Sequence, residues 1–133
     1  MLTIRRETDY ALQMLKVLGK SKNKIMSLNE ISKKTTVSFL FLQKIARKLR
    51  LGKIIEAHQG VDGGYQLVVD PKKVTLRKVV EAMEGQCFIL SCLDASKKIE
   101  CCNPAKNCEL KAKMGKLNKK IVKILDDVKL SDI

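Results

Sequence analysis

All five cysteines of this 133-residue chain fall between Cys87 and Cys108, and no other fact of the sequence limits its structure as much. They stand as Cys87, Cys92, the adjacent pair Cys101 and Cys102, and Cys108. Thiolates are soft ligands that suit iron–sulfur clusters and zinc, and cysteines close in sequence can surround one ion or cluster at little cost in loop-closure entropy. Because Asn103-Pro104 interrupts the stretch and lysine-rich helical sequence follows it, we expect an irregular ligand loop.

Three kinds of site compete for this loop: an iron–sulfur or zinc site, a thiol/disulfide redox pair, and structural cysteines packed in a core. The spacing alone does not choose between them. Zinc sites usually show paired Cys-x2-Cys units, whereas the close pair here is adjacent, so a zinc ribbon fits poorly. Any single cysteine is often a core residue, but five in one hydrophilic loop favour a ligand role.

Composition limits the fold and the partners. With 133 residues, of which 45% are hydrophobic, the chain can bury one sizeable core and an appended element, but hardly two full domains. A net charge of +13 favours a polyanionic partner such as nucleic acid or an anionic membrane, the alternative being a solvated basic surface. No apolar run approaches the ~20 residues that span a bilayer, and no signal pattern opens the chain, so we expect a cytoplasmic protein with reduced thiols and no membrane partner.

The amino-terminal part of the chain shows three helical patterns separated by polar turns. Thr3 is positioned to cap the first helix and Gly19 to end it. Ser27 opens a short second helix as the first residue of a Ser-x-x-Glu capping box, and Ser38 caps a third helix that ends at Gly52. The apolar positions at helical spacing are Ile4, Ala11, Met14, Leu15, Leu18, Ile31, Leu42, Ile45, Ala46 and Leu49.

The second and third of these helices, joined by a short turn, form a helix-turn-helix pattern, in which the second helix enters the major groove of DNA. The outer face of that helix is polar and mostly basic, and carries Gln43, Lys44, Arg47, Lys48 and Arg50. A basic helix face often only keeps the surface solvated, so the stronger evidence for DNA binding is the hairpin that follows. Predicted strands over 54–58 and 65–69 flank a glycine turn over 60–64, and a hairpin directly behind a helix-turn-helix is a wing.

Two more helices are predicted on either side of the cysteine loop. Thr75 can cap one that runs to Gly85. After Cys108, apolar residues recur at alternating steps of four and three, the spacing of a helix that packs along a partner helix. They are Leu110, Met114, Leu117, Ile121, Ile124 and Val128. This stripe implies a dimer, unless it folds back on its own domain, which already has enough apolar residues for a core.

The sequence therefore predicts a mainly α fold with a small β-hairpin wing. Its parts are a winged helix-turn-helix DNA-binding domain over residues 1–85, the cysteine loop over 86–108, and a dimerisation helix with a tail over 109–133. Five motifs carry a further resemblance: Thr8-Asp9-Tyr10-Ala11-Leu12, Leu42-Gln43-Lys44-Ile45, Gly60-Val61-Asp62-Gly63-Gly64-Tyr65-Gln66-Leu67, Val74-Thr75-Leu76 and Val79-Val80-Glu81-Ala82-Met83-Glu84-Gly85. With them, over nearly its whole length, the chain resembles the IscR/NsrR-type family of winged-helix transcription regulators, many of which hold an iron–sulfur cluster.

The resemblance implies a homodimer whose long carboxy-terminal helices cross, with each cysteine loop near the DNA-binding domain of the other subunit. It also implies three cysteine ligands for a two-iron or four-iron cluster, namely Cys92, Cys102 and Cys108, with Cys101 able to replace Cys102. The spacing Cys102-x5-Cys108 matches the family pattern, while the nine residues between Cys92 and Cys102 exceed its usual gap.

The fourth ligand varies within the family. One branch uses a histidine three residues after the last cysteine, where this chain has Lys111. Another branch uses an aspartate in the first helix of the partner subunit, and Asp9 stands at that position. The plainer role for Asp9 is that of an acidic residue in the first turn of a helix, where its charge suits the helix dipole.

DNA contacts are expected from the third helix and the wing. The helix would contribute Ser38, Phe39, Leu40, Gln43, Lys44 and Arg47. Gln43 can pair bidentately with adenine, and Phe39 or Leu40 can meet a thymine methyl group, unless the phenylalanine serves as core cover. Family members commonly carry Arg before the first wing glycine, where this chain has His58-Gln59, so we expect a weaker preference for A·T tracts. His58 is either a phosphate contact or a half-exposed strand residue.

Together these features predict a homodimeric transcription regulator and not an enzyme. It would bind a pseudo-palindromic operator in double-stranded DNA and sense nitric oxide, oxygen, redox state or iron–sulfur supply through its cluster. The alternative mechanism is a cluster-free repressor, switched by thiol oxidation or by a partner protein such as an enzyme of cysteine biosynthesis. A non-regulatory iron–sulfur or zinc carrier would leave the helix-turn-helix and the wing unexplained.

Overall fold

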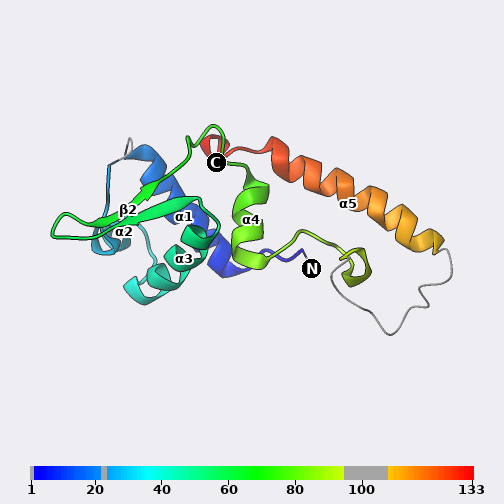
Figure 1. The fold of residues 1–133 in the computed structure, drawn as a ribbon, viewed down its shortest axis with the longest axis horizontal. Coiled ribbons are helices and arrows are strands. Elements are labelled where there is room, and N and C mark those ends of the chain that lie inside the picture. Colours follow the sequence, from blue (N-terminus) through cyan, green and yellow to red (C-terminus); the bar gives the residue numbers. More distant parts are fainter. Residues whose placement is uncertain (1, 22–23, 95–107) are drawn as a thin grey trace.

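The structure, a computed structural model, describes residues 2–21, 24–94 and 108–133. Three helices and a hairpin gather at one end, α4 stands beside them, and α5 projects away as an arm (Figure 1). The elements in order are α1 (Arg6–Lys20), α2 (Leu28–Lys34), α3 (Phe39–Leu51), β1 (Ile55–His58), β2 (Gly64–Leu67), α4 (Leu76–Glu84), the 3-10 helix η1 (Ser91–Leu93), α5 (Glu109–Asp127) and the 3-10 helix η2 (Leu130–Asp132). The predicted mainly α fold with a hairpin wing and a long carboxy-terminal helix is confirmed.

The helix-turn-helix consists of α2 and α3, and both helices begin at the serines that the sequence indicated. The Ser27 side chain accepts a hydrogen bond from the backbone N–H of Glu30, and Ser38 accepts one from that of Phe41. Thr75 caps α4 in the same way, by accepting from the N–H of Lys78. Each cap satisfies a backbone donor that the first turn of a helix leaves without a partner.

The wing is the antiparallel hairpin of β1 and β2. Its register pairs Ile55 with Leu67, Glu56 with Gln66, Ala57 with Tyr65 and His58 with Gly64. The hairpin is fastened to the segment before α2, because Met26 and Tyr65 exchange two backbone hydrogen bonds, of 2.9 and 2.7 Å. A Cβ on Gly64 would overlap the backbone of Met26, so a residue without a side chain lets the strand pass this close. The returning strand ends at Leu67, earlier than the predicted 65–69.

The core lies where α1, α3, α4 and the hairpin meet. The predicted inward residues of the first three helices are buried there: Ala11, Met14, Leu15, Leu18, Ile31, Leu42, Ile45, Ala46 and Leu49. Ile4 is an exception, because it precedes α1 and is 60% exposed. The predicted end of this helix is also corrected, since α1 continues past Gly19 to Lys20.

The carboxy-terminal tail returns to this core. The heptad pattern places Val128 in the long helix, but α5 ends at Asp127 and Val128 has an extended backbone. The N–H of Leu76 donates to the carbonyl of Val128, and the N–H of Leu130 donates to that of Val74, each at 2.8 Å. Leu130 is thereby buried with the core residues of the winged helix.

The start of α1 differs from the prediction. The sequence places Thr3 at its cap, but Arg5 occupies the N-cap position and provides no capping side chain. Glu84, at the end of α4, supplies the acceptor instead: its Oε1 accepts from the Arg5 N–H at 2.9 Å and from the Thr8 hydroxyl at 2.6 Å. A carboxylate also suits the positive end of the helix dipole. The helix is therefore capped by a residue that is remote in sequence.

Glu84→Ala is expected to lower the free energy of unfolding by roughly 1 to 3 kcal/mol, because the buried Thr8 hydroxyl would lose its acceptor. Urea unfolding followed by circular dichroism measures this change. Glu84→Gln is the matched control, since one oxygen accepts both hydrogen bonds and the amide oxygen of glutamine can do the same, so this variant should retain more stability. Equal stability of Glu84→Ala and the unmodified protein would show that α1 does not need this carboxylate.

Candidate nucleic-acid interface and cysteine segment

The exposed face of α3 carries the side chains predicted to read DNA. Leu40 is 76% exposed at the amino-terminal end of the helix, and Phe39 is 39% exposed. Phe41 packs edge-on against Tyr10 of α1, with ring centroids 5.8 Å apart, although 48% of Phe41 is exposed. The polar members of the predicted set are exposed as well: Ser38, Gln43, Lys44 and Arg47.

Two lysines of α3 are held by a carboxylate of α1. Lys44 Nζ lies 2.7 Å from Glu7 Oε1, and Lys48 Nζ lies 3.0 Å from Glu7 Oε2. Hydrogen bonds from Lys44 and then Lys48 lower the pKa of Glu7 to about 2. Lys44, predicted to contact DNA, therefore already has an internal counter-charge. The sequence does not indicate this, because Glu7 stands 37 residues before Lys44.

At the wing, Gln59 is exposed and His58 is half-buried. His58 Nε2 lies 3.0 Å from Glu56 Oε1 and 3.1 Å from Gln66 Oε1, so the ring is engaged within the hairpin. This arrangement corresponds to the role of a half-exposed strand residue, and a phosphate contact by His58 stays a prediction. Val61, at the tip of the wing, is fully exposed.

Cys92 and Cys108 flank the part of the cysteine loop that lies outside the described residues, which includes the predicted ligands Cys101 and Cys102. Cys92 is half-buried in η1. Cys108 is exposed at the N-cap of α5, where its Sγ accepts a hydrogen bond of 3.4 Å from the backbone N–H of Lys111.

The two ends of the loop meet the same half of α5. Leu93 of η1 packs against this helix, since a Cβ placed on Gly115 would lie 3.7 Å from the Leu93 side chain. Gly115 follows Cys108 by seven residues, or roughly 10 Å along the helix axis. Among the described residues, no three His, Cys, Asp or Glu side chains gather closely enough to hold a metal ion. Asp9 is exposed on α1 and accepts a hydrogen bond of 3.2 Å from Gln13.

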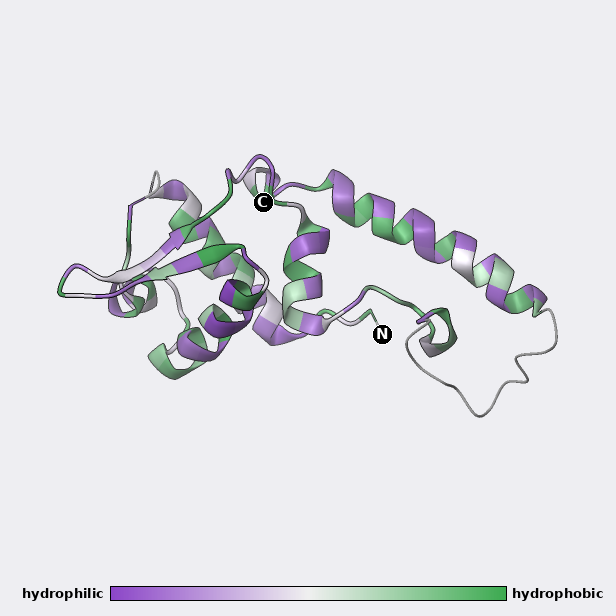
Figure 2. Ribbon diagram, in the orientation of Figure 1, coloured by the Kyte–Doolittle hydropathy of each residue, from purple (hydrophilic) through white to green (hydrophobic). Residues whose placement is uncertain are grey.

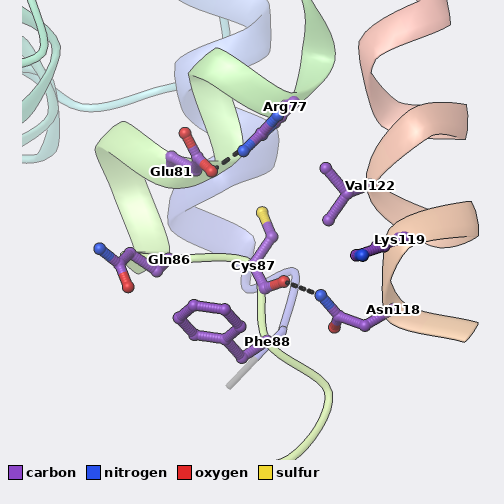
Figure 3. A pocket seen from close by; sticks show the side chains of 8 residues that line it. All are labelled: Arg77, Glu81, Gln86, Cys87, Phe88, Asn118, Lys119 and Val122. Atoms are coloured by element: carbon purple, nitrogen blue, oxygen red, sulfur yellow. Dashed lines mark hydrogen bonds and ion pairs between the residues drawn. The ribbon is translucent and has the colours of Figure 1, made fainter. Parts of the chain in front are cut away.

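Cys87 has a different environment from the other two described cysteines. It is 4% exposed, and its sulfur lies between α4 and α5 in a pocket of about 560 Å³ (Figure 3). Burial raises the pKa of the Cys87 thiol. Asn118 of α5 holds this segment, because its Nδ2 donates to the Cys87 carbonyl at 3.1 Å and its Oδ1 accepts from the Ile89 N–H at 2.9 Å. A buried, protonated thiol is a poor ligand and a poor nucleophile, so Cys87 serves packing.

α5 presents a second, exposed face beside the one that packs on η1 and α4. The predicted dimer stripe lies on it: Leu110 is 64% exposed, Leu117 44% and Ile124 63%, while Met114 and Ile121 are half-buried. Apolar and polar residues alternate along the whole arm (Figure 2). Even this helix of 19 residues is not apolar enough to cross a membrane, and the same holds for every other helix in the described part of the chain.

The winged helix, the cysteine segment and the long helix match one protein family together. The family model of Rrf2, described as an iron-dependent transcriptional regulator, matches residues 4–133. The chain belongs to the Rrf2 family. Curated members similar to this chain include IscR and NsrR proteins, which confirms the resemblance seen in the sequence. As a member of the Rrf2 family it is a transcription regulator and not an enzyme.

Three curated proteins are each similar to more than half of the chain. Protein aau3 of Rhizobium meliloti is 27% identical over 132 residues, which are 99% of this chain and 84% of that protein. NsrR of Bacillus subtilis is 27% identical over 127 residues, 95% of this chain and 86% of its own. IscR of Cereibacter sphaeroides is 35% identical over 74 residues, 56% of this chain and 48% of its own.

Solved structures share the fold. CymR (YrzC), the global cysteine regulator of B. subtilis, superposes with a TM-score of 0.72 at 25% identity, covering 99% of this chain and 95% of its own. The IscR of T. potens gives a TM-score of 0.68 at 22% identity, covering 98% of this chain and 85% of its own.

Proposed function

We propose that this Rrf2-family regulator is a homodimer that reads a pseudo-palindromic operator with α3 and the wing, and senses its signal through an iron–sulfur cluster on the cysteine loop. The observation that carries the DNA interface is the exposed amino-terminal end of α3, where Leu40 is 76% exposed and neighbours the exposed Gln43. The second helix of a helix-turn-helix enters the major groove of DNA. At its amino-terminal end an apolar side chain suits a thymine methyl group and an amide side chain suits adenine.

The residues of this interface divide into two kinds. Base edges are read by Gln43, with Phe39 and Leu40 against methyl groups. Phosphates are contacted by Ser38, Lys44 and Arg47, which fix the position of the helix but carry no sequence information. Gln59 enters the minor groove from the wing, and His58 approaches the adjacent phosphate.

The dimer is supported by the exposed stripe of α5. Leu117 and Ile124 stay in contact with water in one chain, although Leu130 farther on is buried in the core. Burial of each such leucine or isoleucine is worth roughly 1.5 to 3 kcal/mol, so a second copy of the same stripe is a favourable partner. In a dimer paired through this stripe, a twofold axis relates the two subunits. The two copies of α3 then face the two halves of a palindrome.

The cysteine segment fits a soft-metal cofactor by its donor chemistry. Cys92 and Cys108 lie outside the core on elements that pack together, whereas Cys87 is buried. We assign Cys92, Cys108 and one of Cys101 and Cys102 as ligands, with Asp9 of the partner subunit as the fourth. A bound cluster would supply an iron that is open to nitric oxide or oxygen where the harder carboxylate holds it less firmly than thiolate does. Asp9 thereby reports the state of the loop to α1.

A cluster-free repressor is the second candidate. The likeness to CymR, the global cysteine regulator of B. subtilis, favours it. So does the exposure of Cys108, which leaves its thiol open to oxidants. In that case a disulfide or a partner protein at the cysteine loop replaces the cluster as the switch.

Gln43→Ala is expected to erase the preference for adenine at one position of each half-site, at a cost of about 1 to 3 kcal/mol for that base pair. Selection from a randomised DNA pool, followed by sequencing, measures the preference. Arg47→Ala is the comparison, because loss of a phosphate contact should weaken binding to all sequences alike and reduce the salt slope by about 1. An unchanged selected operator for Gln43→Ala would show that Gln43 does not read bases.

Leu117→Asp should dissociate the dimer, because a carboxylate at the centre of an apolar stripe cannot be buried against its symmetry mate without a partner. Sedimentation equilibrium gives the molecular mass in solution. Ala112→Asp introduces the same charge at an exposed position on the other side of α5 and should remain dimeric. If Leu117→Asp sediments as the same dimer as the unmodified protein, the interface lies elsewhere.

Anaerobically purified protein should contain iron and sulfide and absorb visible light. Cys92→Ser and Cys108→Ser are expected to lose this absorption, while Cys87→Ser should retain it, since Cys87 is buried apart from the loop. Asp9→Ala should keep a cluster that is lost faster in air. If the unmodified protein contains no iron and shows no visible absorption, and its DNA binding responds to a thiol oxidant, the cluster hypothesis is rejected and the thiol switch takes its place.

A further inference from the structure

The first turn of α1 lies against the proposed DNA-reading helix, and Glu7 makes the contact. Each of its two carboxylate oxygens faces one ammonium group, Lys44 at 2.7 Å and Lys48 at 3.0 Å. Two oxygens sharing one negative charge are also what a DNA phosphate presents to lysines. Lys44 is the more accessible of the two cations, with 59% of its side chain exposed against 35% for Lys48.

Glu7 is held in place by more than its own ion pairs. Arg5, two residues before it, and Thr8, next to it, are both bound by the Glu84 carboxylate. Lys48 Nζ also approaches the carbonyl of Met83 at 3.5 Å. Surface ion pairs between flexible side chains contribute little, but this carboxylate stands on a helical turn that packing fixes in front of α3.

We propose that Glu7 is a specificity-determining residue, which occupies on Lys44 and Lys48 the place of a DNA phosphate and thereby lowers binding to non-operator DNA more than binding to the operator. This inference rests on the proposed DNA interface. Glu7 reduces the charge of the three-residue cluster to a net +1, so the cluster neutralises about one phosphate fewer than two free lysines would.

Random DNA and operator DNA differ in how much their binding depends on this phosphate contact. Non-specific binding consists essentially of phosphate neutralisation and counterion release. Operator binding adds contacts to base edges, which fix the register of α3 in the groove and do not depend on the charge of Glu7. Because base contacts hold α3 on the operator even when the Lys44 phosphate contact is weak, a built-in carboxylate lowers the affinity for random DNA by a larger factor than the affinity for the operator.

Glu7→Gln tests this, because glutamine keeps the shape and one oxygen acceptor but removes the charge. Binding of the full-length protein to a random-sequence duplex and to an operator selected with the unmodified protein is measured over a salt titration. We expect the salt slope on random DNA to steepen by about 0.9, and the affinity at ~0.1 M salt to rise several-fold. The operator should gain less, so the specificity ratio falls.

Glu109→Gln is the matched control, since it makes the same charge change in the first turn of α5, on an exposed residue of the arm. It should leave the specificity ratio unchanged. Lys44→Ala, made in both backgrounds, should weaken random-DNA binding more when residue 7 is glutamine than when it is glutamate. Glu7→Asp, which draws the carboxylate back by one methylene, should shift the ratio in the same direction and serves if Glu7→Gln does not fold.

An unchanged ratio and slope in Glu7→Gln, or an equal loss of binding to both duplexes, would overturn the inference and leave the DNA-binding function standing. Failure of the unmodified protein to bind any duplex would instead refute the proposed interface itself. The two failures are separated by the unmodified protein alone, before any variant is measured.

Discussion

The Glu84 carboxylate joins the parts of the molecule on which the rest depends. It accepts hydrogen bonds from Arg5 and Thr8 at the start of α1, and it stands at the end of α4, directly before the segment that leads to the cysteines. The N–H of Leu2 donates to the carbonyl of Phe88 in that segment at 2.6 Å. The amino terminus, the end of α4 and the start of the cysteine segment therefore form one hydrogen-bonded unit, which also sets where Glu7 meets α3.

Much of the winged helix could be predicted because its signals are local. Ser27, Ser38 and Thr75 each cap a helix through a backbone N–H three residues on. The apolar spacing of α1 and α3 gave the buried faces, since helical period and burial follow from the same geometry. The resemblance of the motifs supplied what local signals do not, namely the family, and with it the expectation that the cysteines bind an iron–sulfur cluster.

What could not be predicted are contacts between residues remote in sequence. Glu84 and Thr8 are 76 residues apart, and nothing in either segment indicates the pairing. In the sequence Asn118 is one more polar residue of a lysine-rich helix, which predicts a solvent-exposed position. It is only 8% exposed, because its side chain hydrogen-bonds to the backbone of the cysteine segment.

The returning tail gives α5 a fixed end. Val128 is hydrogen-bonded to the start of α4, Leu130 is buried in the core, and Arg77 of α4 holds Asp126 at 3.0 Å. A helix attached only by the loop before it would pivot freely, whereas this one is held at its carboxy-terminal end and, through the hydrogen bonds of Asn118 to Cys87 and Ile89, near its middle. Any movement of the arm relative to the winged helix is therefore greatest at Cys108, where the cysteine loop joins it, and least at the core.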